Sequence, residues 1–137
     1  MAGSRRQRVW DRAEGRCEYC RMPQEFDLQP FQVDHIRAQK HSGATTAANL
    51  ALSCLPCNSY KGANVAGYDP DDDQLQPLYN PRHDDWNEHF EWRGPVLRGK
   101  ASVGRTTIQV LRINLPERVE HRRLLFDAGL LTFDDED

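Results

Sequence analysis

The four cysteines are the feature of this sequence that most constrains its fold. They form two pairs with the same spacing, Cys17/Cys20 and Cys54/Cys57, and none is left over. Each C-x-x-C pair can direct two sulfurs at one tetrahedral ion, so two pairs fill its four coordination positions. Disulfides are disfavoured where thiols stay reduced, and a redox dithiol would not need a second copy. We therefore predict a closed zinc site, which is structural because no position is left for water.

The length and composition favour one small domain in a reducing compartment. A chain of 137 residues is long enough for one modest core. No apolar run approaches the length of a membrane span, and residues 1–10 lack the apolar core of a secretory signal. We therefore expect a single cytoplasmic domain over residues 1–137 with no membrane partner, in which the cysteines remain reduced.

The charge is distributed unevenly along the chain. The net charge of −3 argues weakly against nucleic-acid binding, which usually involves a basic protein. Residues 1–62, however, carry nine basic and six acidic residues, a balance of +3, whereas residues 63–137 carry nine and fifteen, a balance of −6. The acidic residues gather in 69–73 and 134–137, which we interpret as a solvated loop and tail.

The first half of the sequence predicts a helix, a β-hairpin and a second helix. Residues 4–16 have a helical apolar stripe, with Ser4 as N-cap and Gly15 at the end. Residues 30–36 alternate as a strand does, and residues 50–54 can return as its antiparallel partner. A short helix then begins near Leu55, with Pro56 in its first turn and Gly62 just after its end.

We expect the second half of the sequence to pack around the first half. We expect an irregular connection over residues 63–77, a strand at 86–92 with a partner at 94–100, and two helices capped by Thr106 or Thr107 and by Asn114. The domain would then consist of a core at 5–66, an extension at 78–131 and an acidic tail at 132–137.

Four polar residues are candidates for chemistry. If the helix from Leu55 folds back on the hairpin, Asp34, His35, Asn49 and Asn58 can gather around one point. Aspartate and asparagine oxygens suit a hard divalent ion, and a neutral histidine can accept a proton from water near pH 7. Because adjacent strand residues point to opposite faces, we predict that the strand ends or bulges at Asp34 and His35.

The segments CEYC, FQVDHI, ANLALSC and CLPCNSYKG together resemble the HNH endonucleases over residues 5–62. The resemblance implies an α+β protein with a ββα-metal core stapled by the four-cysteine zinc. It also implies that His35 is the general base, that Asp34 and Asn58 hold a catalytic Mg²⁺ or other divalent ion, and that Asn49 orients the hairpin loop. The family's last position is named for histidine, so this chain is an HNN variant.

We therefore expect a metal-dependent endonuclease that hydrolyses phosphodiester bonds in DNA. The candidate phosphate contacts are the basic side chains Arg5, Arg8, Arg12, His41 and Lys61. For the arginine row, a solvated helix face is an equal alternative. Two other functions stay open, a non-catalytic zinc-stabilised nucleic-acid-binding module and a protein-interaction adaptor. The sequence leaves the oligomeric state and the DNA specificity open.

Overall fold

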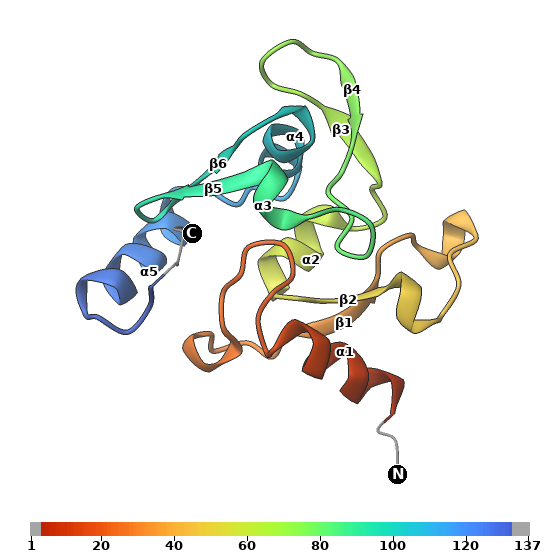
Figure 1. Ribbon diagram of the computed structural model, residues 1–137, viewed down its shortest axis with the longest axis horizontal. Helices are drawn as coiled ribbons and strands as arrows, with labels where there is room; N and C mark the ends of the chain where they lie inside the picture. Colours follow the sequence, from red (N-terminus) through yellow and green to blue (C-terminus); the bar gives the residue numbers. More distant parts are fainter. Residues whose placement is uncertain (1–3, 133–137) are drawn as a thin grey trace. The chain divides into compact units, whose positions relative to one another are not determined.

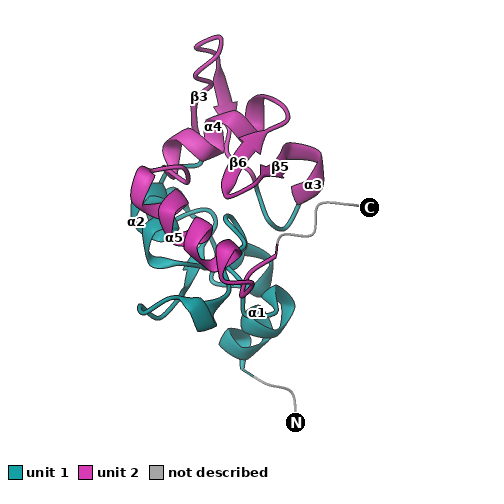
Figure 2. Cartoon of the chain, turned by 90° about the vertical axis from the view of Figure 1, so that its left-hand side faces the viewer, with its two compact units in different colours: residues 1–65, 80–84 teal, residues 66–79, 85–137 magenta. Residues whose placement is uncertain are grey.

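The computed structural model describes residues 4–132, so the end of the predicted acidic tail lies outside the described residues. The chain forms two compact units, drawn in different colours in Figure 2. Unit 1 comprises residues 1–65 and 80–84, and unit 2 comprises residues 66–79 and 85–137. The predicted end of the core near residue 66 coincides with the first division. Residues 80–84, which we had assigned to the extension, return to unit 1.

In the part of the chain that the structure describes, unit 1 contains two α-helices, one β-hairpin and short 3-10 turns. Its elements in chain order are α1 (Arg5–Ala13), η1 (Gln24–Phe26), β1 (Gln32–His35), η2 (Gln39–His41), η3 (Ala47–Asn49), β2 (Leu50–Ser53) and α2 (Leu55–Lys61). Figure 1 shows α1 and α2 on either side of the β1–β2 hairpin. This arrangement confirms the predicted ββα core with a helix before it.

Local sequence signals explain where these helices begin and end. The Ser4 hydroxyl accepts a hydrogen bond from the Gln7 N–H (3.1 Å), as an N-cap does. At the other end of α1 the chain turns through left-handed conformations at Glu14 (φ 56°) and Gly15 (φ 71°). Helix α2 has Pro56 in its first turn and ends at Gly62 (φ 52°).

The two strands of unit 1 pair in antiparallel register. Val33 lies opposite Leu52, and His35 lies opposite Leu50. Strand β1 ends at His35, which confirms the predicted strand end. One step later the Ile36 N–H still donates to the Asn49 carbonyl (2.8 Å), so the chain leaves the hairpin just beyond His35.

The core of unit 1 is small. Val9 and Leu52 are fully buried, and the rings of Trp10 and Phe31 stack with centroids 6.3 Å apart. Glu18 lies in the first cysteine pair, and its backbone N–H donates to the Leu52 carbonyl of β2. Its carboxylate accepts from the Leu52 N–H and also pairs with Arg82. This ion pair fastens segment 80–84 to the first cysteine pair.

Up to residue 132, where the described part of the chain ends, unit 2 contains two β-hairpins and three helices. Its elements are β3 (Ala66–Tyr68), β4 (Leu75–Pro77), α3 (Trp86–His89), β5 (Phe90–Arg93), β6 (Val96–Gly99), α4 (Ser102–Val110) and α5 (Pro116–Asp127). Its core includes a set of aromatic side chains, namely Tyr79, Trp86, Phe90 and Trp92. Within the described residues no helix is both long and apolar enough to cross a membrane.

The strand expected over residues 86–92 is only half correct. Trp86–His89 forms the short helix α3, and the strand begins at Phe90. The Asp85 carboxylate accepts from the Asn87 N–H (3.3 Å), so this N-cap overrides the alternating pattern. The predicted pairing with the following segment is confirmed, since Glu91 lies opposite Arg98.

The connection expected over residues 63–77 contains a β-hairpin. Ala66 pairs with Pro77 and Tyr68 with Leu75, and the acidic run 69–73 forms the turn between the strands. Asp69 is fully buried and pairs with Arg105, whose guanidinium lies 2.7 Å from its Oδ2 atom. The interpretation of this run as a merely solvated loop is therefore wrong for Asp69.

The predicted caps of the last two helices are also wrong. Helix α4 begins at Ser102, so Thr106 and Thr107 lie inside it. The Thr107 hydroxyl donates to the Val103 carbonyl (2.7 Å) and accepts from the Tyr79 N–H (2.8 Å). Asn114 bonds both backbone groups of Leu97 instead of capping α5. These side chains serve tertiary contacts that a local pattern does not reveal.

Candidate active site and metal centre

The four cysteines converge as predicted. The sulfurs of Cys17, Cys20, Cys54 and Cys57 all lie within 4.8 Å of one another, and all four residues are buried. The Cys20 and Cys54 sulfurs are 3.7 Å apart. A tetrahedral zinc site with Zn–S bonds of about 2.3 Å has S–S edges of about 3.8 Å. The cluster therefore fits a closed zinc site.

The protonation of the cluster also fits a cation. The hydrogen bond with Cys17, followed by those with Cys20 and Cys57, raises the pKa of the Cys54 thiol well above its usual range. Burial raises the pKa of Cys57 in the same direction. The Cys54 and Cys57 thiols therefore resist ionisation by themselves, whereas a divalent cation bound by the cluster would stabilise its thiolates. The donor set and its environment are those of a structural zinc centre.

His35 stands at the end of β1 beside Asp34. The His35 Nδ1 atom lies 4.0 Å from Asp34 Oδ1, and the two side chains are 20% and 41% exposed. The other ring nitrogen, Nε2, is 2.9 Å from the Thr45 hydroxyl. The Gln39 amide also donates to that hydroxyl (3.2 Å). The ring is therefore fixed at Nε2 and partly accessible to solvent.

Asn49 fastens the loop that follows the catalytic candidates. Its Oδ1 atom accepts from the Arg37 N–H (2.9 Å), and its Nδ2 group donates to the carbonyls of Arg37 (2.9 Å) and Ala44 (2.8 Å). One amide side chain thus joins both ends of the hairpin loop. Thr45, the partner of His35, follows directly after Ala44.

The same loop has a tight glycine. A Cβ atom at Gly43 would lie 1.7 Å from the Arg37 carbonyl oxygen, so a larger residue cannot be accommodated without moving the backbone. The loop therefore folds so that the backbone of Gly43 packs directly against the backbone of Arg37. The loop is therefore a compact structure that can hold Thr45 against His35.

Two of the expected phosphate contacts hold backbone carbonyls instead. Lys61 is only 4% exposed, and its ammonium group donates to the carbonyls of Ile36 (2.8 Å) and His35 (3.4 Å). Burial lowers its pKa, and the nearby Asp34 carboxylate partly offsets the shift. Its position favours a structural role over contact with a surface phosphate.

Arg12 makes similar contacts on the other side of the hairpin, although the residue is exposed. Its guanidinium donates to the carbonyls of Ala47 (3.0 Å) and Leu50 (2.8 Å), which bracket Asn49 in the sequence. Burial, with a smaller effect of Arg8, lowers the pKa of Arg12. Arg12 therefore fixes the backbone from which Asn49 projects.

The remaining candidates are all at least partly exposed to solvent. Arg5, Arg8 and His41 are exposed, the first two on α1 and the third in the hairpin loop. Asn58 lies on α2, which packs against β1, and is partly exposed. Because Asn58 and Lys61 are three residues apart on one helix face, the bonds from Lys61 to the end of β1 bring that face toward Asp34 and His35.

Sequence reasoning missed Thr45, Glu18 and Arg82. Thr45 lies in a polar loop without a pattern that points to His35. Glu18 lies inside the first cysteine pair, and its partner Arg82 is 64 residues away, in a segment assigned to the extension. Burial, with a smaller effect of Arg12, lowers the pKa of Arg82 to about 10. No local signal could have identified these contacts because each depends on how distant segments meet.

Comparisons with known proteins agree with this geometry. Residues 17–64 match the family model of the HNH endonucleases. The Septu protein PtuB of Bacillus thuringiensis is 27% identical over 115 residues, which cover 82% of this chain and 42% of that protein. The chain thus spans less than half the length of this relative. No solved structure matches. Residues 17–64, which contain both cysteine pairs and the four polar candidates, are thus the part of the chain that is similar to the HNH endonucleases.

Proposed function

We propose that this protein is a metal-dependent endonuclease that hydrolyses phosphodiester bonds in DNA, with His35 as the general base. The observation that carries the proposal is the position of His35. It ends β1 next to a carboxylate, and its Nε2 atom is held by Thr45. A general base must keep a free nitrogen within reach of water in a fixed orientation.

The contacts of Thr45 permit the tautomer of His35 that the proposed chemistry needs, although the hydroxyl can equally donate to Nε2. The threonine oxygen has two lone pairs, and the Gln39 amide can only donate to it. When the His35 Nε2–H donates to the second lone pair, the Nδ1 atom keeps its own lone pair on the side of Asp34. The attacking water would lose its proton to Nδ1.

Asp34 and Asn58 would hold the divalent cation, through a carboxylate and an amide oxygen. Such oxygen donors suit Mg²⁺ and similar hard ions. When bound, the cation would offset the negative charge that develops on the phosphoryl and leaving oxygens. The buried ammonium of Lys61 would keep α2, and with it Asn58, against the strand end.

The remaining assignments follow from the surface of unit 1. Arg5, Arg8 and His41 would contact DNA phosphates, since their side chains are exposed and cationic or able to donate. Asn49 would act as a positioning residue through the loop that it closes. A thiolate zinc site requires reducing conditions, which favours the cytoplasm.

The test is cleavage of supercoiled plasmid DNA with and without Mg²⁺ or Mn²⁺. His35→Ala should lower the rate by about 10² to 10⁴-fold, the usual contribution of a general base. The matched control is His83→Ala, an exposed histidine of the same unit, which should cut normally. Zinc content and melting temperature should be unchanged in both variants. If the unaltered protein fails to nick with any divalent ion, the non-catalytic binding module becomes the better assignment.

A second pair of variants tests the contact between Thr45 and His35. Thr45→Val removes the acceptor of the His35 Nε2–H. It should lower kcat more than it raises KM, because the imidazole ring loses its orientation while the affinity of the protein for DNA is kept. Thr45→Ser keeps the hydroxyl and should restore kcat. Equal kcat values for Thr45→Val and the unaltered protein would exclude this role of Thr45.

A further inference from the structure

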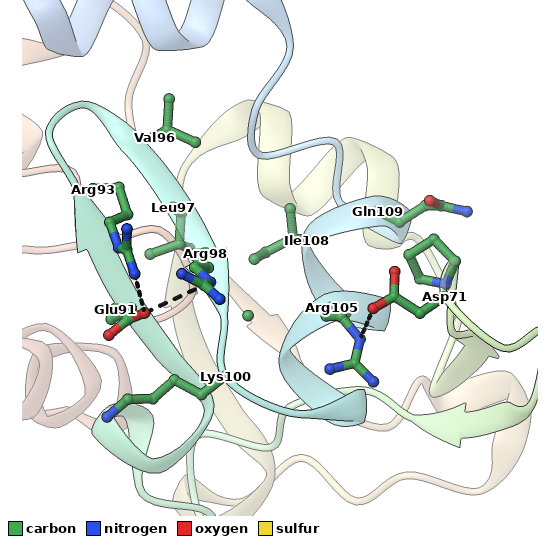
Figure 3. Close-up of a pocket in the computed structure, with 12 residues that line it drawn as sticks. Asp71, Glu91, Arg93, Val96, Leu97, Arg98, Lys100, Arg105, Ile108 and Gln109 are labelled. Carbon is green, nitrogen blue, oxygen red and sulfur yellow. Dashed lines mark ion pairs between the residues drawn. The ribbon is translucent and has the colours of Figure 1, made fainter.

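Unit 2 has a groove that the proposed chemistry does not use. It has a volume of about 660 Å³ and lies between the β5–β6 hairpin, helix α4 and the start of the acidic turn. Figure 3 shows the side chains that line it. Four of them are cationic, namely Arg93, Arg98, Lys100 and Arg105. All the lining residues belong to unit 2.

The two hairpin arginines have more donors than partners. Arg93 and Arg98 approach the same carboxylate, Glu91, at N–O distances of 3.6 and 3.7 Å. These distances exceed those of good charge-assisted hydrogen bonds, which are about 2.7–2.9 Å. The two side chains are 63% and 56% exposed, and each guanidinium has five N–H donors. One carboxylate therefore leaves one positive charge and most of the donors available.

The opposite wall of the groove is closer to neutral. Arg105 is bound to the buried Asp69 and also lies 3.0 Å from Asp71. Lys100 extends the row beyond the end of β6, where its ammonium donates to the Asn87 carbonyl (2.7 Å). A carbonyl partner leaves the charge of Lys100 uncompensated. The excess positive charge therefore lies along the hairpin, at Arg93, Arg98 and Lys100.

This charge runs against the composition of the region. Residues 63–137 have a balance of −6, so a basic row there is not a consequence of a generally basic surface. Arg98 and Lys100 are two residues apart in sequence, about 6.7 Å in an extended chain, and they form a row and not a single convergent point. Such a row suits a ligand whose negative charges repeat along a chain.

We propose that this groove binds the sugar-phosphate backbone of nucleic acid, as a second contact surface in addition to the one proposed for unit 1. The inference rests on the proposed function only in taking nucleic acid as the ligand. Arg93, Arg98 and Lys100 contact phosphates, and Val96 provides an apolar edge for the sugar. The Glu91 carboxylate lies 3.6 Å from the Arg93 guanidinium and 3.7 Å from that of Arg98, which leaves most of their donors available to the phosphates.

The test is the salt dependence of binding, measured by the fluorescence anisotropy of a labelled DNA duplex. It uses the full chain with His35→Ala so that the duplex stays intact. Each lost phosphate contact lowers the slope of log K against log salt by about 0.9 for duplex DNA. Arg98→Gln should therefore lower the slope by about 0.9, and the triple change Arg93→Gln, Arg98→Gln and Lys100→Gln by roughly 2 to 3.

The matched control is Arg123→Gln. Arg123 is exposed to a similar extent, 48%, and belongs to the same unit, but it is paired with Glu120 and Asp127 on its own helix. It should leave the slope unchanged. An equal fall for Arg98→Gln and Arg123→Gln would overturn the proposal, because it would show a general effect of net charge. An unchanged slope in the triple variant would also overturn it.

Two further measurements separate this proposal from its rivals and from the proposed function. Inorganic phosphate at 10 mM, compared with a buffer of equal ionic strength, should not displace the duplex. If phosphate weakened duplex binding as much as the triple change does, the groove would be a site for a single phosphate. Plasmid cleavage is measured in parallel on proteins that retain His35. If the triple change lowers the slope but the protein does not cleave plasmid, the groove proposal stands and the nuclease proposal fails. If the protein cleaves plasmid but the triple change leaves the slope unchanged, the nuclease proposal stands and the groove proposal fails.

Discussion

The two units reach a stable interior by different means. Unit 1 has four buried cysteines and a small apolar core, and a zinc ion fits its centre. Unit 2 has no cysteine and packs aromatic rings, with Trp86 and Phe90 centroids 5.1 Å apart. The comparison shows why catalysis is proposed in unit 1. A metal cluster can hold short strands and loops rigid without a large core, which leaves polar side chains near the surface.

Both units bury positive charge, but with different partners. Lys61 in unit 1 donates to carbonyls at the end of β1. In unit 2, Arg122 is 1% exposed, donates to the Pro95 and Ile113 carbonyls, and lies over the Trp92 ring. In unit 1 the buried cation fixes the proposed site, whereas in unit 2 it fixes the aromatic core.

The largest expected effect comes from loss of the metal. Cys57→Ser should abolish zinc binding and unfold unit 1, because apparent binding free energies of structural zinc are about 10–16 kcal/mol. The amide NMR signals of unit 1 should collapse while many signals of unit 2 remain dispersed. Zinc content checks the first half of the expectation. Equal collapse of both sets of signals would show that the units are one cooperative structure.

The second prediction concerns a variant that shortens a core side chain of unit 2 and leaves the cysteines of unit 1 unchanged. Phe90 is 1% exposed, and Phe90→Ala should lower the free energy of unfolding of unit 2 by about 3–5 kcal/mol through loss of apolar burial and creation of a cavity. Denaturant titration followed on the amide signals of unit 2 measures this, and zinc content should be retained. Leu130→Ala, at a side chain that is 58% exposed, is the control and should change little.

A smaller effect is expected at the buried cation of unit 1. Lys61→Met leaves the Ile36 carbonyl without its donor and should cost about 1–3 kcal/mol in the free energy of unfolding of unit 1. It should also slow plasmid cleavage, since the end of β1 is no longer fastened to α2. Lys40→Met, on the exposed hairpin loop, removes the same charge and should have neither effect.

The smallest effect is a dependence on pH in unit 2. The hydrogen bonds from Arg105 are the largest cause that lowers the pKa of Asp69 from 3.8 to about 2. The stability that this shift provides is complete above about pH 4 and is lost as the pH falls toward 2. The difference in stability between the unaltered protein and Asp69→Asn should therefore shrink between pH 5 and pH 2. A constant difference would mean that the charge of Asp69 contributes nothing.

Much of unit 1 could be predicted because its signals are local. Ser4, Pro56 and Gly62 mark helix ends by their own backbone and side-chain chemistry, and two C-x-x-C pairs specify a cluster wherever the chain brings them together. In unit 2 the prediction failed where two local signals competed. Asp85 capped a helix within an alternating pattern, and the acidic run had both a turn composition and a buried ion pair.

The sequence alone determined the four-cysteine cluster, the ββα order and the strand end at His35, because each depends on residue types at fixed short spacings. Only the tertiary structure decided that Thr45 holds His35, that Lys61 and Arg12 bind carbonyls, and that Arg82 pairs with Glu18. These contacts join residues 10 to 64 positions apart. A long polar side chain has the same appearance in a sequence whether it faces solvent or a distant carbonyl, and only the packing of the chain around it removes the first possibility.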